Sequence, residues 1–564
     1  MTDRRRSLAT AVGTISFLLV CEWFFLREMY GSDRLFGDLG DGRLTTLIAE
    51  HWYHVFRGEA SVGALGMFWP ETNTLAYSDM LLGFGIIHSL LRVVGLNIYI
   101  AYKVTILIVH AAGTFSCYYL LRKVLGVRNI WSLFGTAAFS FADTGIMGLL
   151  HSQLAAAWML PLFGIFIVRF FQNLEDRKKR NIYALLAVFQ IVLVLYTAWY
   201  MAFFTALFTC TLGGVLLIIL LIRKEAGKQI GRFFRIVKWD LVIYVLFGIL
   251  LVIPFVLLEL PVLNGSGGFS FWDSFVFLPR VSDVVHVTHT NWLLGAVFGN
   301  SASMGGRNHE VIRGYSLVLL AVFIAGIVLQ ARASYTERGN KEKILRKDGT
   351  PCMNRRVICF AIAAAVLLDL ILMIRTESGF SLWKWVNKYF PGGKAIRAVG
   401  RFMLFLSLPL SLVTAVMADG LKENGILGKR RLSAVISLCL VGLLLVSNVN
   451  TSSPGEWREG EALARIQQVS IKPEDCEVFY MTHANPNEII EFQQTDAWEI
   501  ADALGVKTIN GYSGQAPAGW GAWLINQEGY LEAVEAWVKE KNLNKVYEYN
   551  WEENKWNKST YCSW

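Results

Sequence analysis

The chain has 564 residues, of which 54% are hydrophobic and only 17% are charged, and its mean hydropathy is +0.42. A single soluble core cannot bury this much apolar surface, so the composition excludes an ordinary soluble protein and indicates a polytopic membrane protein. The net charge of +9 would favour nucleic-acid binding in a soluble chain. Here the basic residues recur in alternate loops between apolar runs, which excludes a single nucleic-acid-binding patch.

Apolar windows of the length that a transmembrane helix needs, about 20 residues, recur along the chain, and we count about eleven of them. The basic clusters between them fall on one side if the N-terminus is cytoplasmic, which places the remaining loops and the C-terminal tail outside. The first window follows Arg4, Arg5 and Arg6, and we interpret it as a retained signal anchor. The windows start near Leu8, Ile98, Asn129, Leu154, Ile182, Ala202, Leu241, Tyr315, Val357, Phe402 and Leu432.

The first outward loop, residues 27–97, is too long for a turn and is expected to be functional. Within it, glycines flank Asp41, and an amphipathic stretch follows at 44–56. A carboxylate held there above the membrane can act as a general base or a metal ligand, whereas the competing interpretation is a solvated Gly/Asp turn. The apolar stretch 80–94 is short for a span, so we predict a helix at the outer interface.

The second outward loop, residues 261–314, contains His286, His289 and His309, with Glu310 beside the last. Their spacing fits no zinc-binding pattern, so no metal ligand is predicted there. A divalent cation is the one cofactor left open, and none is certain.

The third outward loop, residues 375–401, breaks the charge rule because basic residues collect on the side where they should be sparse. Such an excess at a membrane surface favours an anionic partner, and a lipid-linked phosphate matches guanidinium forks. We expect Arg397 and Arg401, with Lys394, to bind it, since a helix would place two residues four apart on one face. For Lys384 and Lys388, anchoring to lipid head groups explains the charge equally well.

Beyond Ser447 the sequence turns polar. We therefore predict a transmembrane domain at 1–448 and a small external α/β domain at 449–564, with a strand at 476–481 and helices at 495–504 and 530–543. Cys476 and Cys562 both lie outside in this arrangement, so a disulfide between them is plausible in an oxidising compartment.

With these elements in place, the chain resembles the GT-C superfamily of polytopic glycosyltransferases, which carry an aspartate in the first external loop. Asp41, or alternatively Asp38, stands at that place in the run Gly37-Asp38-Leu39-Gly40-Asp41-Gly42-Arg43. Further stretches that look like those of bacterial members are Phe68-Trp69-Pro70, residues 74–79, His151-Ser152-Gln153, residues 396–402 and residues 510–514. The likeness covers nearly the whole chain. It implies a substrate cavity lined by Arg43, His51, Tyr77, Asp79, Asp143, His151, Gln153 and Tyr512.

The resemblance implies a mostly α, polytopic enzyme of the bacterial cytoplasmic membrane, with its active face extracellular or periplasmic. It would move a sugar from a polyprenyl-phosphate donor to a glycan, lipid or protein acceptor, with inversion and with Asp41 as base. The alternatives are a transporter or flippase of a lipid-linked saccharide, or a noncatalytic relative. A transporter should carry ionisable residues near the middle of its spans. The spans here are nearly free of them apart from Lys103, Asp240 and Asp369, which lie toward span ends. An enzyme requires Asp41, Arg397 and Arg401 to share one cavity.

Overall fold

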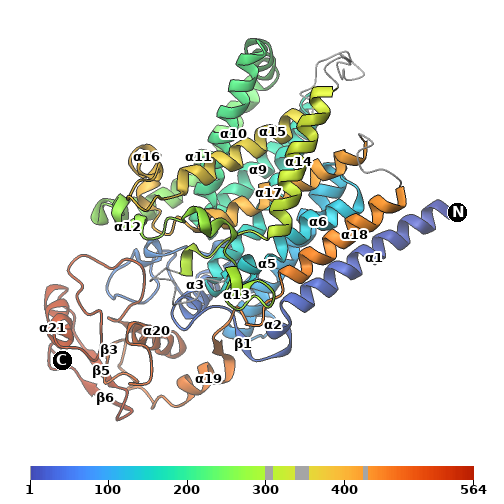
Figure 1. The fold of residues 1–564 in the computed structure, drawn as a ribbon. Coiled ribbons are helices and arrows are strands. Elements are labelled where there is room, and N and C mark those ends of the chain that lie inside the picture. The colour runs from blue at the N-terminus through green and yellow to red at the C-terminus, as the bar shows by residue number, and fades with distance from the viewer. Residues whose placement is uncertain (1, 299–308, 337–354, 424–429) are drawn as a thin grey trace.

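The computed structural model describes residues 2–298, 309–336, 355–423 and 430–564. Most of the described chain is helical, and the helices form a bundle with a small sheet-containing domain at one end (Figure 1). The predicted fold class, a mostly α protein with many apolar helices, is confirmed.

Among the described residues, nine segments are long and apolar enough to cross a membrane. Eight of them begin close to a predicted window, whereas the segment predicted from near Leu241 begins already at Ala226. Two further windows correspond to shorter apolar helices, α14 (Leu317–Thr336) and α18 (Arg430–Ser447). The total of about eleven spans and the inside-to-outside orientation stay predictions. The main helices of the nine segments are α1 (Thr2–Phe25), α5 (Ile98–Tyr119), α6 (Asn129–Ser140), α8 (Leu160–Gln172), α9 (Arg177–Thr197), α10 (Trp199–Ile222), α11 (Ala226–Ser266), α15 (Arg355–Met373) and α17 (Arg401–Glu423).

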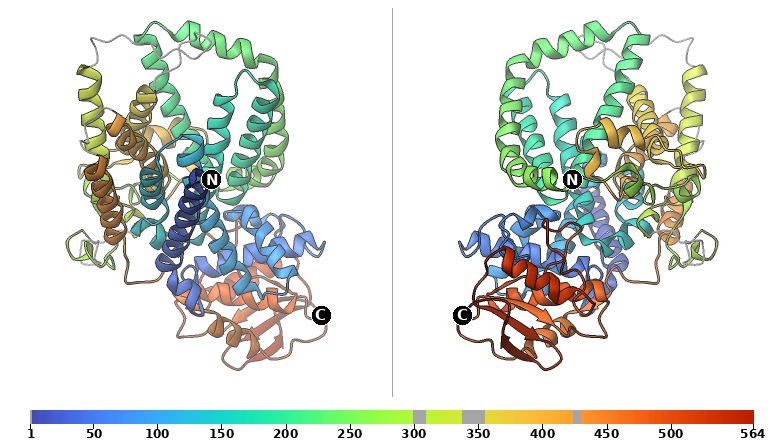
Figure 2. Two further views of the ribbon diagram at one scale, coloured as in Figure 1. Left: turned by 90° about the vertical axis from the view of Figure 1, so that its right-hand side faces the viewer. Right: turned by 90° about the vertical axis from the view of Figure 1, so that its left-hand side faces the viewer.

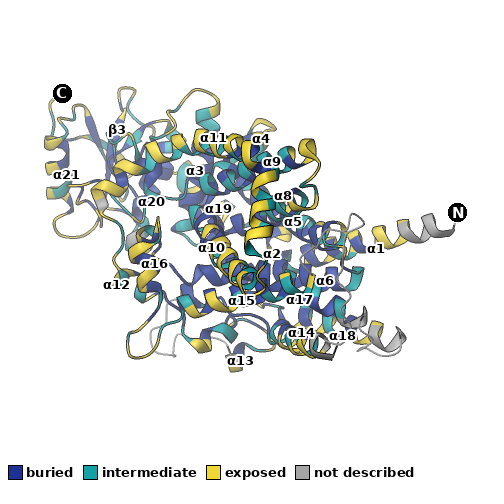
Figure 3. Cartoon of the chain, turned by 90° about the horizontal axis from the view of Figure 1, so that it is seen from above, coloured by how far each residue is buried: buried dark blue, intermediate teal, exposed yellow. Residues whose placement is uncertain are grey.

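Helices α10 and α11 expose large apolar side chains along much of their length, seen as yellow ribbon in Figure 3. Contiguous exposed apolar surface of this kind marks contact with lipid rather than with water. The connection between these two helices lies at the end of the bundle opposite to the C-terminal domain (Figure 1). Examples of the exposed side chains are Ile218, Leu221, Ile222, Leu250 and Leu257.

Ionisable side chains inside the bundle have polar partners. Asp240 pairs with Arg180 and Arg177, Lys103 donates to the Ser32 carbonyl at 2.6 Å, and Thr211 donates to Asp369 at 2.7 Å. The structure adds one buried pair that the sequence analysis passed over: Glu22 of α1 lies 2.7 Å from His110 of α5. These contacts join helices to one another, which is a structural role.

The first external loop folds into two packed helices, α3 (Asp41–Phe56) and α4 (Leu82–Val93), of which α4 is the short apolar helix predicted at 80–94. Trp52 of α3 packs directly on Gly85 of α4, where an added Cβ would lie 2.4 Å from the indole. Glu50 accepts hydrogen bonds from His88 at 2.7 Å and Arg92 at 2.9 Å. The helices therefore form one rigid unit at the end of the bundle.

The C-terminal domain contains a four-stranded sheet of order β4-β3-β5-β6, with β3 parallel to β4 and β5, and β6 antiparallel to β5. The structure contains the predicted strand at 476–481 and the predicted helices at 495–504 and 530–543. Their observed ends differ from the predicted ends by three residues or fewer. Cys476 and Cys562 are both free thiols, so the disulfide considered from the sequence is absent. The elements are β2 (Trp457–Arg458), α19 (Glu459–Gln467), β3 (Val478–Thr482), α20 (Gln493–Leu504), β4 (Lys507–Thr508), α21 (Tyr530–Glu540), β5 (Val546–Asn550) and β6 (Lys555–Lys558).

The C-terminal domain is fastened to the first external loop, which lies between it and the bundle (Figure 2). Strand β1 (Arg34–Leu35) pairs antiparallel with β2. The Trp498 indole donates to the Leu65 carbonyl at 3.0 Å, and the Trp537 indole donates to the Trp69 carbonyl at 2.8 Å. Two segments more than 400 residues apart thus form one layer at the end of the helix bundle.

Candidate active site

Asp41 is the first residue of α3, and its position is set by Asp38. The Asp38 carboxylate accepts hydrogen bonds from the backbone N–H groups of Gly40 at 2.9 Å and Asp41 at 2.6 Å. This caps the helix, since these N–H groups have no partner within it. Of the two aspartates that the sequence left open, Asp38 holds the turn and Asp41 carries the carboxylate that the turn presents.

The Asp41 carboxylate is held by two side chains from the segment that follows α7 (Asp143–Met147). Oδ2 of Asp41 lies 2.8 Å from Nδ1 of His151, and Nε2 of Gln153 donates to the same oxygen at 3.3 Å. Ser152, between them, is fixed by contacts of 2.8 Å with the Thr45 hydroxyl of α3 and the Tyr102 hydroxyl of α5. The predicted site residues Asp41, His151 and Gln153 are thus brought together.

His151 links Asp41 to a second ion pair that the sequence analysis did not assign. Its Nε2 lies 3.1 Å from Oε1 of Glu310, and both Glu310 oxygens accept hydrogen bonds from the Arg401 guanidinium, the one from Nε at 3.0 Å. Arg313 lies 3.6 Å from the same carboxylate. Acidic and basic side chains therefore alternate along one row, which consists of Asp41, His151, Glu310 and Arg401. The only sequence signal for Glu310 was its place beside His309.

Burial and neighbouring charges have opposite effects on the pKa values of the groups in this row. Burial alone would raise the pKa of Asp41, but the hydrogen bond and charge of His151 outweigh it and lower the pKa below the ordinary value of 3.8. Burial would likewise raise the pKa of Glu310, but Arg401 and His151 hold it well below 4.5. Burial would lower the pKa of His151, whereas Glu310 and Asp41 raise it above 6.5. At neutral pH both carboxylates are therefore ionised, and their charges favour the protonated form of the His151 imidazole between them.

Asp41 opens onto a cavity of about 1510 Å³ that also contains Arg397 and Arg401. The geometric requirement set by the sequence analysis, one cavity for these three residues, is met. The volume of the cavity is large enough for a substrate bigger than a small metabolite. The predicted residues that line it are Asp38, Asp41, Tyr77, Asp79, His151, Gln153, Lys394, Arg397, Arg401 and Tyr512.

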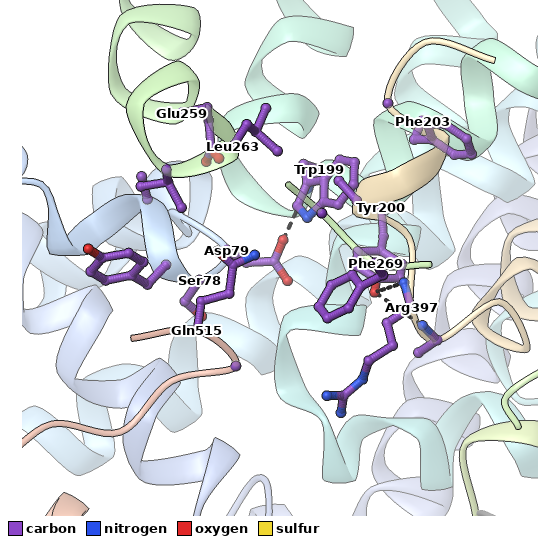
Figure 4. Close-up of a pocket in the computed structure, with 18 of the residues that line it drawn as sticks. Ser78, Asp79, Trp199, Tyr200, Phe203, Glu259, Leu263, Phe269, Arg397 and Gln515 are labelled. Atoms are coloured by element: carbon purple, nitrogen blue, oxygen red, sulfur yellow. Dashed lines mark hydrogen bonds between the residues drawn. The ribbon is translucent and has the colours of Figure 1, made fainter. Parts of the chain in front are cut away.

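Arg397 differs from Arg401 in what its guanidinium contacts. It lies over the rings of Phe277, with 5.1 Å to the centroid, and Phe269, with 5.7 Å, and its backbone N–H donates to the Tyr200 hydroxyl at 3.0 Å (Figure 4). The side chain is exposed, and no carboxylate of the described chain lies within ion-pair distance of it. Its donors thus remain available to an anion in the cavity.

The predicted arrangement of the two arginines on one helix face is wrong. Helix α17 begins at Arg401, so Arg397 lies in the preceding loop. The chain turns at Gly400, where an added Cβ would lie 2.6 Å from the Glu310 carbonyl oxygen. Both side chains nevertheless reach the cavity, because the loop passes along its wall. Lys394 also lines it and is exposed.

A second pair of carboxylates lies elsewhere on the cavity wall. Asp79 accepts a hydrogen bond from the Trp199 backbone N–H at 3.1 Å (Figure 4), and burial raises its pKa to about 6. Glu259 of α11, which the sequence analysis did not identify, lines the cavity as well. The sequence analysis took this region of α11 for a lipid-facing span, which hid the carboxylate.

The cavity continues between three helices of the bundle as an apolar lane. Its side chains come from α9, α10 and α11, two of which also face lipid. An apolar lane between helices that also expose apolar side chains is suited to the hydrocarbon chain of a lipid substrate. Side chains of the lane include Leu195, Ala202, Phe203, Val252, Val256 and Leu263.

Three residues predicted for the cavity lie elsewhere. Arg43 is fully buried beneath the C-terminal domain, where it pairs with Asp496. His51 lines a smaller pocket of about 260 Å³ and contacts the Val62 carbonyl at 3.1 Å. Asp143 is buried and accepts hydrogen bonds from Thr288 at 2.8 Å and from Asn450. All three serve packing, because their polar atoms are used by neighbouring segments.

Among the described residues, no three His, Cys, Asp or Glu side chains converge in a geometry that could hold a metal ion. His286, considered as a ligand from the sequence, contacts Asp283 at 2.8 Å instead, and His309 contributes to a short 3-10 helix. The divalent cation left open by the sequence analysis stays a prediction.

No family model and no curated protein sequence matches the chain. Among solved structures, ArnT from Cupriavidus metallidurans in the apo state matches with a TM-score of 0.44 and 11% identity, over 89% of this chain and 86% of that one. The same protein bound to undecaprenyl phosphate matches with a TM-score of 0.43 and 12% identity, over 88% and 85%. A mutant form of arabinofuranosyltransferase AftD from Mycobacteria matches with a TM-score of 0.47 and 13% identity, over 86% of this chain and only 31% of that one.

These matches report a likeness to the solved structures at low identity. At TM-scores of 0.43 to 0.47 and identities of 11 to 13%, they assign no activity, substrate or site residue to this chain. Its function depends on the geometry of its own cavity.

Proposed function

We propose that this protein is a membrane glycosyltransferase that moves a sugar from a polyprenyl-phosphate donor to an acceptor hydroxyl. The observation that carries the proposal is the shared cavity, in which the Asp41 carboxylate, the Arg397 guanidinium and an apolar lane meet. A lipid-linked sugar needs these three features: a base for the acceptor, a cation for the phosphate and a channel for the chain. We place this cavity at the outer face of a bacterial cytoplasmic membrane.

The hydrocarbon chain of the donor occupies the lane between α9, α10 and α11, and its phosphate contacts Arg397. The acceptor oxygen attacks the anomeric carbon while the bond from that carbon to the phosphate oxygen breaks. The phosphate leaves with the electron pair, and Arg397 stabilises its charge. The hydroxyl proton passes to Asp41. One displacement of this kind inverts the anomeric configuration.

The Asp41–His151–Glu310–Arg401 row supports the role of Asp41. Its lowered pKa keeps the carboxylate ionised at neutral pH, and the His151 contact at 2.8 Å fixes its direction. Arg401 is engaged by both oxygens of Glu310, so in this arrangement it orients the row, while Arg397 is the cation open to the phosphate.

The experiment uses the purified protein in lipid nanodiscs with a panel of undecaprenyl-phosphate sugars and, as acceptor, envelope material of the cells that make the protein. Mass spectrometry measures the undecaprenyl phosphate that is released as the sugar moves to the acceptor. Asp41→Asn should lower the release rate by about 10²- to 10⁴-fold, the usual contribution of a positioned general base. Asp33→Asn is the matched control, because Asp33 is exposed in the same loop and contacts only Arg458 among charged groups of the described chain, at 2.8 Å. Its rate should stay at the wild-type level.

Two outcomes would contradict the proposal. Wild-type release by Asp41→Asn would remove Asp41 from the reaction. A wild-type protein that binds undecaprenyl phosphate but releases none from any donor would favour a transporter or a noncatalytic protein instead.

A further inference from the structure

The cavity has a second end, which the C-terminal domain forms. Here the lane of aliphatic side chains gives way to aromatic rings, amides and hydroxyls. The segment 511–515 and the residues 523–524 face Asp38, Asp41 and Ser78 of the first external loop across this end. The proposed donor site uses none of these C-terminal residues.

The segment 510–515 is held firmly as part of the cavity wall. The Ser513 hydroxyl donates to the Tyr77 carbonyl at 2.6 Å, and the Gly511 N–H donates to Gln494 at 3.1 Å. Gly511 packs so closely on Phe68 that an added Cβ would lie 2.3 Å from the ring. The wall is therefore preformed, which reduces the entropy cost of binding a ligand.

Two aromatic side chains give this end its shape. Trp523 is 50% exposed and stands edge-on to the buried Trp520, with 4.9 Å between centroids, and the Trp520 indole donates to the Ile509 carbonyl at 3.0 Å. Tyr512 stands edge-on to Phe492, and its hydroxyl would lie 2.7 Å from a Cβ added at Gly40. Tyr512 thus reaches the turn that presents Asp41, while Trp523 offers an anchored aromatic surface at the cavity wall.

Two amide oxygens at the cavity wall lack partners in the described structure. They are Oε1 of Gln515, one of the lining residues labelled in Figure 4, and Oε1 of Gln153, whose side chain is only 7% exposed. Leaving a buried acceptor unpaired costs about 1–3 kcal/mol, so such atoms favour a ligand that brings O–H donors. Gln153 also donates to Asp41 at 3.3 Å, which places its free oxygen beside the base.

Resting on the proposed function, we infer that the acceptor is a saccharide, which enters from the aqueous side against the C-terminal domain. Its ring stacks on Trp523 and Tyr512, and its hydroxyls donate to Gln515 and Gln153, which brings one hydroxyl to Asp41. A lipid acceptor would need aliphatic side chains here, and a peptide would need a hydrophobic groove or an open strand edge. This end offers ring faces and side-chain amides instead.

The test is binding of a carbohydrate probe to the full-length protein in nanodiscs, measured by thermophoresis of the labelled protein. The probe is the polysaccharide released by mild acid from the envelope of cells that make the protein. It is compared with the same material after periodate oxidation, with a tryptic digest of the envelope proteins and with an envelope lipid extract. Trp523→Ala should weaken polysaccharide binding about tenfold, on the scale of lost aromatic stacking and burial.

Trp564→Ala is the matched control, because Trp564 is a 43% exposed tryptophan of the same domain that packs on Tyr547 and does not line the cavity. It should bind like the wild type. Gln515→Leu is a second variant, which keeps the aromatic surface and should weaken binding severalfold. Undecaprenyl phosphate binding, which needs only the other end of the cavity, should be unchanged in all three variants and shows that they are folded.

Binding that is equal in wild type, Trp523→Ala and Gln515→Leu would overturn the inference. So would binding that survives periodate oxidation, or binding of the peptide or lipid fraction in place of the polysaccharide. Failure of the proposed function looks different: polysaccharide binding would still depend on Trp523, while no donor would release undecaprenyl phosphate.

Discussion

Two arginine sites in the external half of the molecule use the same side chain in opposite ways. Arg43 lies beneath the C-terminal domain, fully buried, where it pairs with Asp496 and lies 3.4 Å from Glu488 and 3.6 Å from Glu499. Arg397 lies against two aromatic rings at the cavity wall. The comparison shows that the role of a buried or cavity-lining arginine depends on whether other side chains of the protein already occupy its guanidinium donors. An arginine whose donors are all used joins segments, whereas one packed only on rings is ready to bind an anion.

Of the variants that test this difference between Arg43 and Arg397, Arg43→Met should have the largest effect, and the effect should be on stability. The change removes a fully buried cation from Asp496, Glu488 and Glu499. Within the described chain, Asp496 and Glu499 then keep only Arg465 as a cation, at 3.8 and 3.4 Å. Breaking a buried ion pair in this way costs about 3–5 kcal/mol. The thermal midpoint of the detergent-solubilised protein should fall, and a protease should cleave the C-terminal domain faster. Arg458→Met is the control, because its pair with Asp33 is exposed and should contribute less than about 1 kcal/mol. Equal effects of the two variants would show that the Arg43 cluster does not hold the domain.

Arg397→Ala should have the next largest effect, and on binding rather than on stability. A hydrogen bond to a charged group contributes about 1.5–3 kcal/mol, so the dissociation constant of undecaprenyl phosphate should rise about 10- to 150-fold. Arg280→Ala is the control, because Arg280 pairs with Glu377 at 3.1 Å and lies outside the cavity. Binding titrations in nanodiscs measure both. An unchanged constant for Arg397→Ala would place the phosphate elsewhere, for example at Lys394.

The smallest effect, a severalfold change in rate, should appear in the pH dependence. The raised pKa of His151 means that its contacts with Asp41 and Glu310 are complete below 6.5 and are lost as the pH rises through the higher folded value. The release rate should therefore fall at alkaline pH, and His151→Gln should abolish this decline. Asp79 has a pKa of about 6 and titrates at lower pH, so Asp79→Asn is the control and should keep the alkaline decline. A decline that persists in His151→Gln would assign it to another group.

The sequence was sufficient to predict elements whose residues are neighbours along the chain or resemble a known pattern. The apolar windows and the short helix at 80–94 followed from local composition, and the sharing of one cavity by Asp41, Arg397 and His151 followed from the resemblance. Contacts between distant segments did not. Nothing near Arg43 indicates that Asp496 will neutralise it, and nothing near Asp143 indicates that Thr288 and Asn450 will enclose it.

Two misinterpretations have physical causes of the same kind. The spacing of Arg397 and Arg401 suggested a helix, but Gly400 must pack on the Glu310 carbonyl, so the helix begins only at Arg401. Glu259 looked like part of a lipid-facing span, yet the helix turns this position toward the cavity. In both cases tertiary packing decided the outcome, which a single sequence does not show.

The pairing of β1 with β2 fixes the order in which the protein can be completed during synthesis. Strand β1 leaves the ribosome early, but its partner follows only after the last helix of the bundle, and Tyr512 follows later still. A nascent chain therefore inserts its helices while the Asp41 turn is still uncovered, and the C-terminal domain packs over this turn last. A truncated chain that stops after α18 would keep the apolar lane and Asp41 but would lack the part of the cavity wall that the C-terminal domain supplies, so premature termination should yield an inserted protein with an incomplete cavity.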